Sequence, residues 1–193
     1  MTAEAERILV ESGAVQEGHF LLTSGRHSPV YVEKFNVLQR PRYAEQLCKM
    51  IADHFRDQNV EVVAAPAVGA IIIAYEVARQ LGVRSIFAER EEGNWVFRRG
   101  FALSPGERTL VVEDVVTTGG SVEQVLSVVR GHGAQVVGVG ILVDRLISPV
   151  DFGAPLFSCH RVSLPTYTPD ECPLCAKGLP VTKPGSSGLT TSP

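Results

Sequence analysis

The stretch from Arg108 to Ser121 constrains the fold of this chain more than any other stretch does. Its residues 109–112 are apolar or β-branched, a pattern that predicts a strand buried on both faces. Two carboxylates, Glu113 and Asp114, follow at the point where we expect the strand to end. A turn with hydroxyl groups and two glycines comes next, and the apolar spacing after it predicts a helix. This order is typical of a phosphate-binding site between a strand and a helix.

The predicted turn supplies what a phosphate group needs. Glycines let the backbone approach a ligand closely, and the unpaired N–H groups at the start of the helix favour an anion. The hydroxyls of Thr117, Thr118 and Ser121 can donate hydrogen bonds to the same oxygens. Glu113 and Asp114 would repel a phosphate, so we expect them to bind sugar hydroxyls, directly or through a hard divalent cation. The predicted ligand is therefore a phosphorylated sugar.

An ordinary helix cap is the alternative interpretation of the same turn. Charged residues are rarely placed at the end of an apolar strand without a partner, so the acidic pair favours a ligand site. A nucleotide-binding P-loop is excluded, because no Gly-Lys-Ser or Gly-Lys-Thr follows the glycines.

Composition narrows the classes of partner. The formal net charge of −3 gives no electrostatic reason to expect binding to nucleic acid or to an anionic membrane. No apolar run reaches the length of a membrane span, and the first residues lack the basic start and apolar core of a signal peptide. We therefore expect a cytoplasmic protein whose four cysteines are reduced.

Strand and helix patterns alternate between residues 60 and 145, which predicts an α/β fold with a central, mostly parallel sheet flanked by helices. Ligands of such sheets bind at the carboxyl ends of the strands, where the acidic pair and the pair Asp144 and Arg145 fall. The segment 89–95 is expected to be a polar loop. The predicted strands are 60–65, 83–88, 96–101, 109–112, 136–143 and 155–164, and the predicted helices are 2–14, 41–55, 71–81 and the one that begins at Ser121.

The run Val111–Ser121, which reads Val-Val-Glu-Asp-Val-Val-Thr-Thr-Gly-Gly-Ser, resembles the phosphoribosyl-pyrophosphate (PRPP) motif of type I phosphoribosyltransferases. The segment 18–32 contains Leu-x-Ser-Gly-x-x-Ser-Pro-x-Tyr and resembles the N-terminal hood of orotate phosphoribosyltransferases. The resemblance covers roughly residues 13–145. It implies a phosphoribosyltransferase domain over 1–165, with a hood of about 1–38 and a core of about 39–165. Residues 166–193 are expected to form a cysteine-containing segment and, from about Lys177, a disordered tail.

The resemblance also implies a reaction. Orotate and PRPP would give orotidine 5′-monophosphate and pyrophosphate, in pyrimidine (UMP) biosynthesis. Mg²⁺ would be held through PRPP rather than by direct protein ligation, and a homodimer would share its active sites between subunits. Two alternatives stay open: a phosphoribosyltransferase for another base such as a purine, and a non-catalytic regulatory protein that senses PRPP.

The family's functional positions can be carried onto this sequence by motif. Glu113 and Asp114 are expected to be catalytic through the ribose hydroxyls, together with Arg90 at the leaving group. The residues expected to bind PRPP are Val68, Gly69, Ala70, Arg90, Glu113, Asp114, Val115, Val116, Thr117, Thr118, Gly119, Gly120 and Ser121. The residues expected to bind orotate are Arg26, His27, Tyr31, Thr117 and Arg145.

The chain departs from the family in its cations. The family often has a lysine where this chain has Thr23, another in the turn that here holds Gly69 and Ala70, and lysines with a histidine in the segment 89–95. No lysine lies between residues 50 and 176, so any cation from that part must be arginine. Arg90 is the main candidate, with Arg98 and Arg99 expected to point to opposite faces of a strand. A solvated hairpin tip is the alternative interpretation.

The motif Cys172-Pro-Leu-Cys175 has the spacing of half a zinc site, and Cys159 with His160 could complete it. A redox pair is a second possibility, and unliganded thiols are the ordinary expectation.

Overall fold

The computed structural model describes residues 3–22, 24–146 and 148–184. Its main sheet has the strand order β5-β4-β3-β6-β7-β8, in which β5 is antiparallel to β4 and every other neighbouring pair is parallel. This confirms the predicted α/β fold with a mostly parallel sheet. The strands are β3 (Val62–Pro66), β4 (Arg84–Glu91), β5 (Asn94–Phe97), β6 (Arg108–Val116), β7 (Gln135–Asp144) and β8 (Leu156–Arg161).

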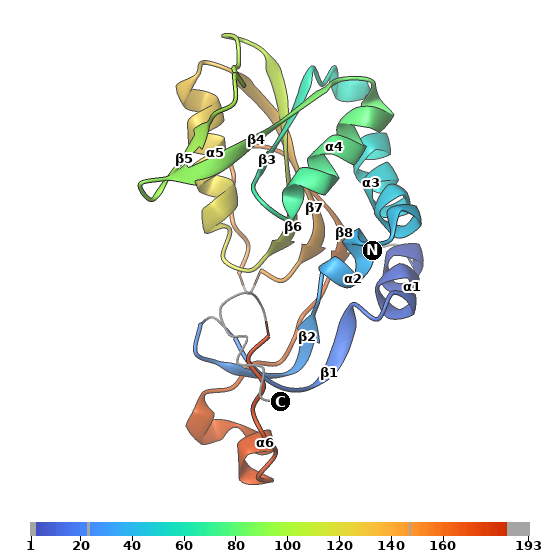
Figure 1. The fold of residues 1–193 in the computed structure, drawn as a ribbon, viewed down its shortest axis with the longest axis vertical. Coiled ribbons are helices and arrows are strands. Elements are labelled where there is room, and N and C mark those ends of the chain that lie inside the picture. The colour runs from blue at the N-terminus through green and yellow to red at the C-terminus, as the bar shows by residue number, and fades with distance from the viewer. Residues whose placement is uncertain (1–2, 23, 147, 185–193) are drawn as a thin grey trace.

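Helices cover both faces of this sheet because its central strands are apolar on both sides. Val63 and Ala65 of β3 belong to the cluster under α3 and α4, whereas Val62 and Ala64 belong to the cluster under α5. Figure 1 shows α5 on one side of the sheet and α3 with α4 on the other. The helices are α1 (Ala3–Glu11), α2 (Phe35–Leu38), α3 (Pro41–Phe55), α4 (Ala70–Leu81) and α5 (Gly120–Gly131), and the 3₁₀ turn η1 (Arg56–Gln58) follows α3.

A second, two-stranded sheet lies below the carboxyl ends of the main strands in Figure 1. It pairs β1 (Val15–Leu21) with β2 (His27–Val32) and is called the hood hairpin below. The C-terminal segment 166–184 packs against it and contains η2 (Pro169–Glu171) and α6 (Pro173–Ala176). Leu21 N donates to Thr182 O at 2.8 Å, and Thr182 N donates to His19 O at 2.8 Å. The expectation of disorder from Lys177 is therefore wrong as far as residue 184, and residues 185–193 lie outside the described part.

Other boundaries also differ from the predicted ones. β6 continues through the acidic pair, because it pairs with β7 as far as Val116 and Asp144. The polar loop expected at 89–95 is a two-residue hairpin, since β4 runs to Glu91 and β5 starts at Asn94. Both turn residues have positive φ, 49° at Glu92 and 87° at Gly93, as the tight turn of a hairpin requires.

The expected strand 96–101 ends at Phe97, and the one expected at 155–164 ends at Arg161. Arg99 has a φ of 56°, which extended strand geometry does not allow, so Arg98 and Arg99 follow the strand rather than alternate along it. Within the described ranges, no helix has the length and apolar character needed to cross a membrane.

Candidate active site

The acidic pair is buried in the last third of β6, with Glu113 7% exposed and Asp114 3% exposed. Asp114 Oδ2 lies 2.7 Å from Lys34 Nζ in an ion pair, and Asp114 Oδ1 accepts a hydrogen bond from Val115 N at 2.6 Å. Glu113 Oε1 accepts from Asp114 N at 3.0 Å. Burial raises the pKa of Glu113 to about 8, and the neighbouring charge of Asp114 acts in the same direction.

The raised pKa of Glu113 makes stability depend on pH. The folded protein keeps a proton that the unfolded chain releases above its ordinary pKa of 4.5, so stability falls as the pH rises from there toward 8. Glu113→Gln removes this loss. We expect the unfolding free energy of Glu113→Gln, relative to the unchanged protein, to increase between about pH 5 and pH 8 in urea titrations. Glu123→Gln, an exposed change on α5, is the matched control, and a pH-independent difference for Glu113→Gln would contradict the raised pKa.

The turn between β3 and α4 lies directly against Asp114. A Cβ atom added to Gly69 would stand 2.0 Å from Asp114 Oδ2 and 3.3 Å from Lys34 Cε, so only glycine fits there. The neighbouring Val68 is 74% exposed, and the peptide bond between Ala67 and Val68 is cis. Three segments distant in sequence therefore meet at one point: the chain after β2, the turn after β3 and the end of β6.

The turn after β6 leads into α5 as the sequence predicts. Gly119 has a φ of 86°, and α5 begins at Gly120 without a side-chain hydrogen bond that caps it. The side chains of Thr117, Thr118 and Ser121 are exposed. The structure thus gives these hydroxyls no capping role, and they stay available to a ligand beside the N–H groups of the helix start.

Tyr31 and Arg145 come from segments next to the acidic pair, because Tyr31 lies on β2 just before Lys34 and Arg145 follows β7, the neighbour of β6. Burial raises the pKa of Tyr31, and the charges of Glu33, Lys34, Arg145 and Asp114 all act on it, which places the phenol near the ion pair. Burial lowers the pKa of Arg145. Arg145 N donates to Val116 O at 2.8 Å, while its side-chain Nε is buried without a hydrogen-bond partner in the described structure. A guanidinium in this state is suited to receive an anionic group.

Arg26 and His27 do not join Tyr31 at this place. Arg26 donates to Thr166 twice, from Nε to Oγ1 at 2.9 Å and to the carbonyl oxygen at 2.8 Å. His27 Nδ1 lies 3.2 Å from Cys175 Sγ. Four residues of extended strand span about 13 Å, so His27 and Tyr31 occupy opposite ends of β2 although they are close in sequence.

The arginines of the β4–β5 region are held within their own hairpin. The guanidinium of Arg90 stacks on the ring of Trp95 at 4.5 Å and donates to Gly93 O. Arg98 pairs with Glu91 at 3.3 Å, and Arg99 pairs with Glu89 at 2.8 Å. These contacts fit the hairpin interpretation, and none of them reaches the acidic pair.

The expected half zinc site has different partners from those predicted. Cys159 is buried in the core, where its Sγ lies 3.3 Å from Leu47 O, and His160 follows it on β8. The structure does not bring either residue to Cys172 and Cys175. His19 and His27 of the hood hairpin stand there instead. No local sequence pattern indicates this grouping, because the two histidines lie about 150 residues before the cysteines.

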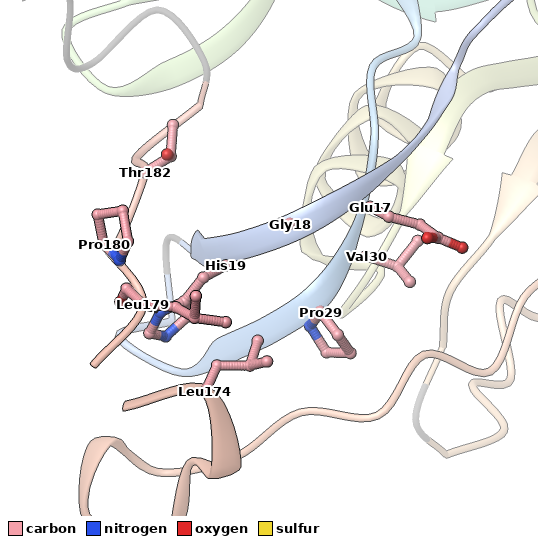
Figure 2. Close-up of a pocket in the computed structure, with 9 residues that line it drawn as sticks. All are labelled: Glu17, Gly18, His19, Pro29, Val30, Leu174, Leu179, Pro180 and Thr182. Atoms are coloured by element: carbon pink, nitrogen blue, oxygen red, sulfur yellow. Dashed lines mark hydrogen bonds between the residues drawn. The ribbon is translucent and has the colours of Figure 1, made fainter. Parts of the chain in front are cut away.

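Lys34 is the site residue that the motif analysis missed. The family's lysines fall at Thr23, at Gly69 and Ala70 and in the segment 89–95, whereas Lys34 comes from the chain after β2. A pocket of about 590 Å³ also lies away from the acidic pair, between the hood hairpin and the C-terminal segment (Figure 2). We take the acidic pair as the candidate active site, because the turn predicted to bind phosphate and the buried charges converge there and not at this pocket.

Comparisons with known proteins agree with this geometry. A family model described as a phosphoribosyl transferase domain matches residues 36–161. An orotate phosphoribosyltransferase of Desulforamulus reducens is 52% identical over 183 residues, which cover 95% of this chain and 96% of that protein. The orotate phosphoribosyltransferase of Caldanaerobacter subterraneus subsp. tengcongensis is 51% identical over 175 residues, which cover 91% of this chain and 92% of that protein.

Solved structures show the same fold. The crystal structure of orotate phosphoribosyltransferase from Aeropyrum pernix matches with a TM-score of 0.70 and 26% identity, over 81% of this chain and 92% of its own. An adenine phosphoribosyltransferase from Rhodothermus marinus matches with a TM-score of 0.66 over 83% of this chain and all of its own. Its 18% identity supports the fold alone.

Proposed function

The chain belongs to the phosphoribosyltransferase family, and on that premise we propose that it is an orotate phosphoribosyltransferase. It transfers the 5-phosphoribosyl group from PRPP to orotate and releases orotidine 5′-monophosphate and pyrophosphate, a step of pyrimidine (UMP) biosynthesis. The observation that carries the proposal is the buried acidic pair, which lies between an uncapped phosphate turn and the glycine turn before α4. The identity of about one half to orotate enzymes supports the choice of base.

The proposed reaction requires that the protein position the two substrates and stabilise the charges of the transition state. Breaking the bond from C1 to pyrophosphate develops positive charge on the ribose and negative charge on the leaving group. Thr117 to Ser121 bind the 5′-phosphate, with Val115 and Val116 forming the strand end before them. Glu113 and Asp114 hold the ribose hydroxyls. With a pKa of about 8, Glu113 is mostly protonated at neutral pH and can donate as well as accept, whereas an ionised Asp114 only accepts.

The pyrophosphate binds at the turn from Val68 to Ala70, where the start of α4 presents backbone N–H groups. Lys34 supplies the cation that this turn lacks. Without ligand it neutralises Asp114 at 2.7 Å, and its side chain passes beside Gly69. A bound PRPP brings its own negative charge to this place, so Lys34 gains a second anionic partner there.

Phosphoribosyltransferases use Mg²⁺ together with PRPP, and the residues of this site fit the ion. Asp114 already attracts a cation, Lys34, and carboxylate oxygens are the donors that Mg²⁺ prefers. Glu113 and Asp114 would hold it by way of the ribose hydroxyls of PRPP. When bound, the ion neutralises charge on the pyrophosphate oxygens.

Orotate is planar and carries a carboxylate, which a guanidinium recognises with paired hydrogen bonds. Tyr31 and Arg145 are our candidates for this contact, with Thr117 at the turn between base and ribose. Arg26 and His27 receive no role at the base, since their contacts are with Thr166 and Cys175. The test is PRPP turnover with a panel of bases. Product with orotate supports the proposal, turnover only with a purine would replace it, and PRPP binding without turnover of any base would favour a sensor.

Arg90 is the proposed cation at the leaving pyrophosphate. Its guanidinium stacks on Trp95, so a contact with PRPP requires the side chain to leave the ring. We expect Arg90→Ala to lower kcat about 10-fold while KM for PRPP changes less, because the interaction strengthens in the transition state. Arg90→Lys should recover part of the loss. Arg98→Ala is the control, and an unchanged kcat with a lower melting temperature would show that Arg90 serves only the hairpin.

We also propose a homodimer in the cytoplasm. The free state of all four thiols fits a reducing compartment. Ile72 and Tyr75 on the outer face of α4 are 42% and 65% exposed and continue the exposed Val68 at helical spacing, an apolar strip suited to a partner subunit. Light scattering should give the mass of a dimer, and Ile72→Glu with Tyr75→Glu should give a monomer. Val10→Glu, on the exposed face of α1, is the control; a monomeric unchanged protein would reject the dimer.

A further inference from the structure

Four potential metal ligands from two distant parts of the chain meet beside the hood hairpin. His19 lies on β1 and His27 begins β2, while Cys172 directly precedes α6 and Cys175 lies within it. Each residue offers one nitrogen or sulfur atom, and these four atoms all lie within 4.8 Å of one another. The side chains of His19, His27 and Cys172 are buried. The group takes no part in the reaction proposed above.

We propose that these four residues bind one structural Zn²⁺ ion. In a tetrahedral site with Zn–S of about 2.3 Å and Zn–N of about 2.1 Å, neighbouring ligand atoms are about 3.3–3.8 Å apart. His19 Nε2 lies 3.5 Å from Cys172 Sγ and 3.6 Å from Cys175 Sγ. His27 Nδ1 lies 3.2 Å from Cys175 Sγ. These three pairs of ligand atoms therefore lie close to the spacing that zinc imposes, whereas the two imidazole nitrogens, at 2.9 Å, would have to move apart.

The second nitrogen of His19 fixes which atom faces the cysteines. His19 Nδ1 lies 2.9 Å from Leu179 O, and a carbonyl accepts only, so Nδ1 carries the proton. Nε2 then presents its lone pair to the two sulfur atoms. A backbone carbonyl behind a ligating histidine is the usual support of a protein zinc site. Figure 2 shows His19 reaching from β1 toward Leu179 and Leu174 of the C-terminal segment.

The donor set favours zinc over harder metals. Two thiolates and two imidazoles suit Zn²⁺ in tetrahedral geometry, whereas Mg²⁺ and Ca²⁺ select oxygen ligands. A simple hydrogen bond between His27 Nδ1 and His19 Nε2, which are 2.9 Å apart, is the competing explanation for the histidine pair. In that case the two thiols would add only weak hydrogen bonds to the same nitrogens, while a metal ion uses all four groups as ligands at once.

Zinc at this place would tie the C-terminal segment to the hood hairpin. Backbone hydrogen bonds flank the site on both sides, from Leu21 N to Thr182 O and between His27 and Tyr167 in both directions. Leu174, Leu179 and Pro180 of the same segment line the 590 Å³ pocket beside the hood hairpin. A two-stranded hairpin is marginally stable alone, so the ion and the segment together would hold in place the hood strand that carries Tyr31.

The first test measures zinc in the full-length protein, purified under reducing conditions in zinc-containing buffer and then freed of loose metal on a desalting column. We expect about one zinc per chain by elemental analysis, and less than about one tenth in Cys172→Ser with Cys175→Ser. His27→Gln should also lose most of the metal. Cys48→Ala and His132→Gln are the matched controls outside the cluster, and both should keep it.

The second test does not depend on how well the variants fold. Unchanged protein is stripped with a chelator and titrated with Co²⁺, which should produce the visible absorption of a tetrahedral cobalt–thiolate centre at one equivalent. Chelation should also speed proteolysis within residues 166–184, and zinc should reverse this. The proposal is overturned if the folded, reduced protein holds no zinc and gives no cobalt spectrum, if Cys172 and Cys175 prove to be joined by a disulfide, or if the control variants lose the metal equally.

Discussion

Replacing both members of the acidic pair, Glu113→Gln together with Asp114→Asn, should lower kcat/KM for PRPP by at least about 100-fold while the protein stays folded. The amides keep nearly the shape of the acids, but Asp114→Asn removes a negative charge and Glu113→Gln replaces a carboxyl group that can donate as well as accept. On our proposal both groups hold the ribose hydroxyls as positive charge develops on the sugar. The protein should still fold, because burial disfavours the ionised form of Glu113 and the neutral amide avoids that cost. Lys34 loses its partner, but its side chain is 36% exposed and can turn to solvent. The rate is followed by formation of orotidine 5′-monophosphate, and folding by circular dichroism.

Two exposed acids of α1 provide the matched control. Glu4→Gln with Glu6→Gln replaces two acids by their amides, as the double variant of the site does, at a place without contact to it. This control should turn over at the normal rate. Near-normal turnover of the Glu113 and Asp114 variant would remove these residues from the reaction, and a loss that follows from unfolding would assign them to stability instead.

The parts of the fold that repeat along the chain could be predicted from the sequence. The runs 60–65 and 109–112 are mostly apolar or β-branched, so they predict strands covered on both sides, and the structure confirms a strand in each, from Val62 in the first. The turn into α5 could also be predicted, because Thr117 to Ser121 are contiguous in sequence, while the binding of phosphate there stays a prediction. Strand ends could not be placed as well. The extension of β6 to Val116 depends on hydrogen bonds to β7, which local sequence does not encode.

Contacts between segments that are distant in sequence could not be predicted. Lys34 reaches Asp114 only because the chain after β2 folds over the end of β6. In the same way, Cys172 and Cys175 meet His19 and His27 through the packing of 166–184 on the hood hairpin, whereas the nearby Cys-His pair of β8 is in the core. The prediction that His27 and Tyr31 both contact orotate was based on their closeness in sequence. The extended strand β2 places them at opposite ends.

Gly69→Ala tests whether the three segments that meet at Asp114 work as one site. The new methyl group would stand 2.0 Å from Asp114 Oδ2, far inside contact distance, so either the carboxylate or the turn must move. A displacement of about 1 Å in a positioning group can reduce the rate about 100-fold, and we expect a loss of that size in kcat/KM for PRPP. Gly131→Ala at the end of α5 is the control, because a Cβ there meets nothing within 4 Å.

The origin of the effect can be isolated by a double-mutant cycle on stability. Gly69→Ala should lower the unfolding free energy of the unchanged protein, since it breaks the contact of Lys34 with Asp114 or strains the turn. In an Asp114→Ala background the carboxylate is gone and the methyl group fits, so Gly69→Ala should then cost almost nothing. Urea unfolding of the four proteins measures this coupling. Equal effects of Gly69→Ala in both backgrounds would mean that the turn and Asp114 are independent. The clash with Asp114 would then no longer explain why residue 69 is glycine.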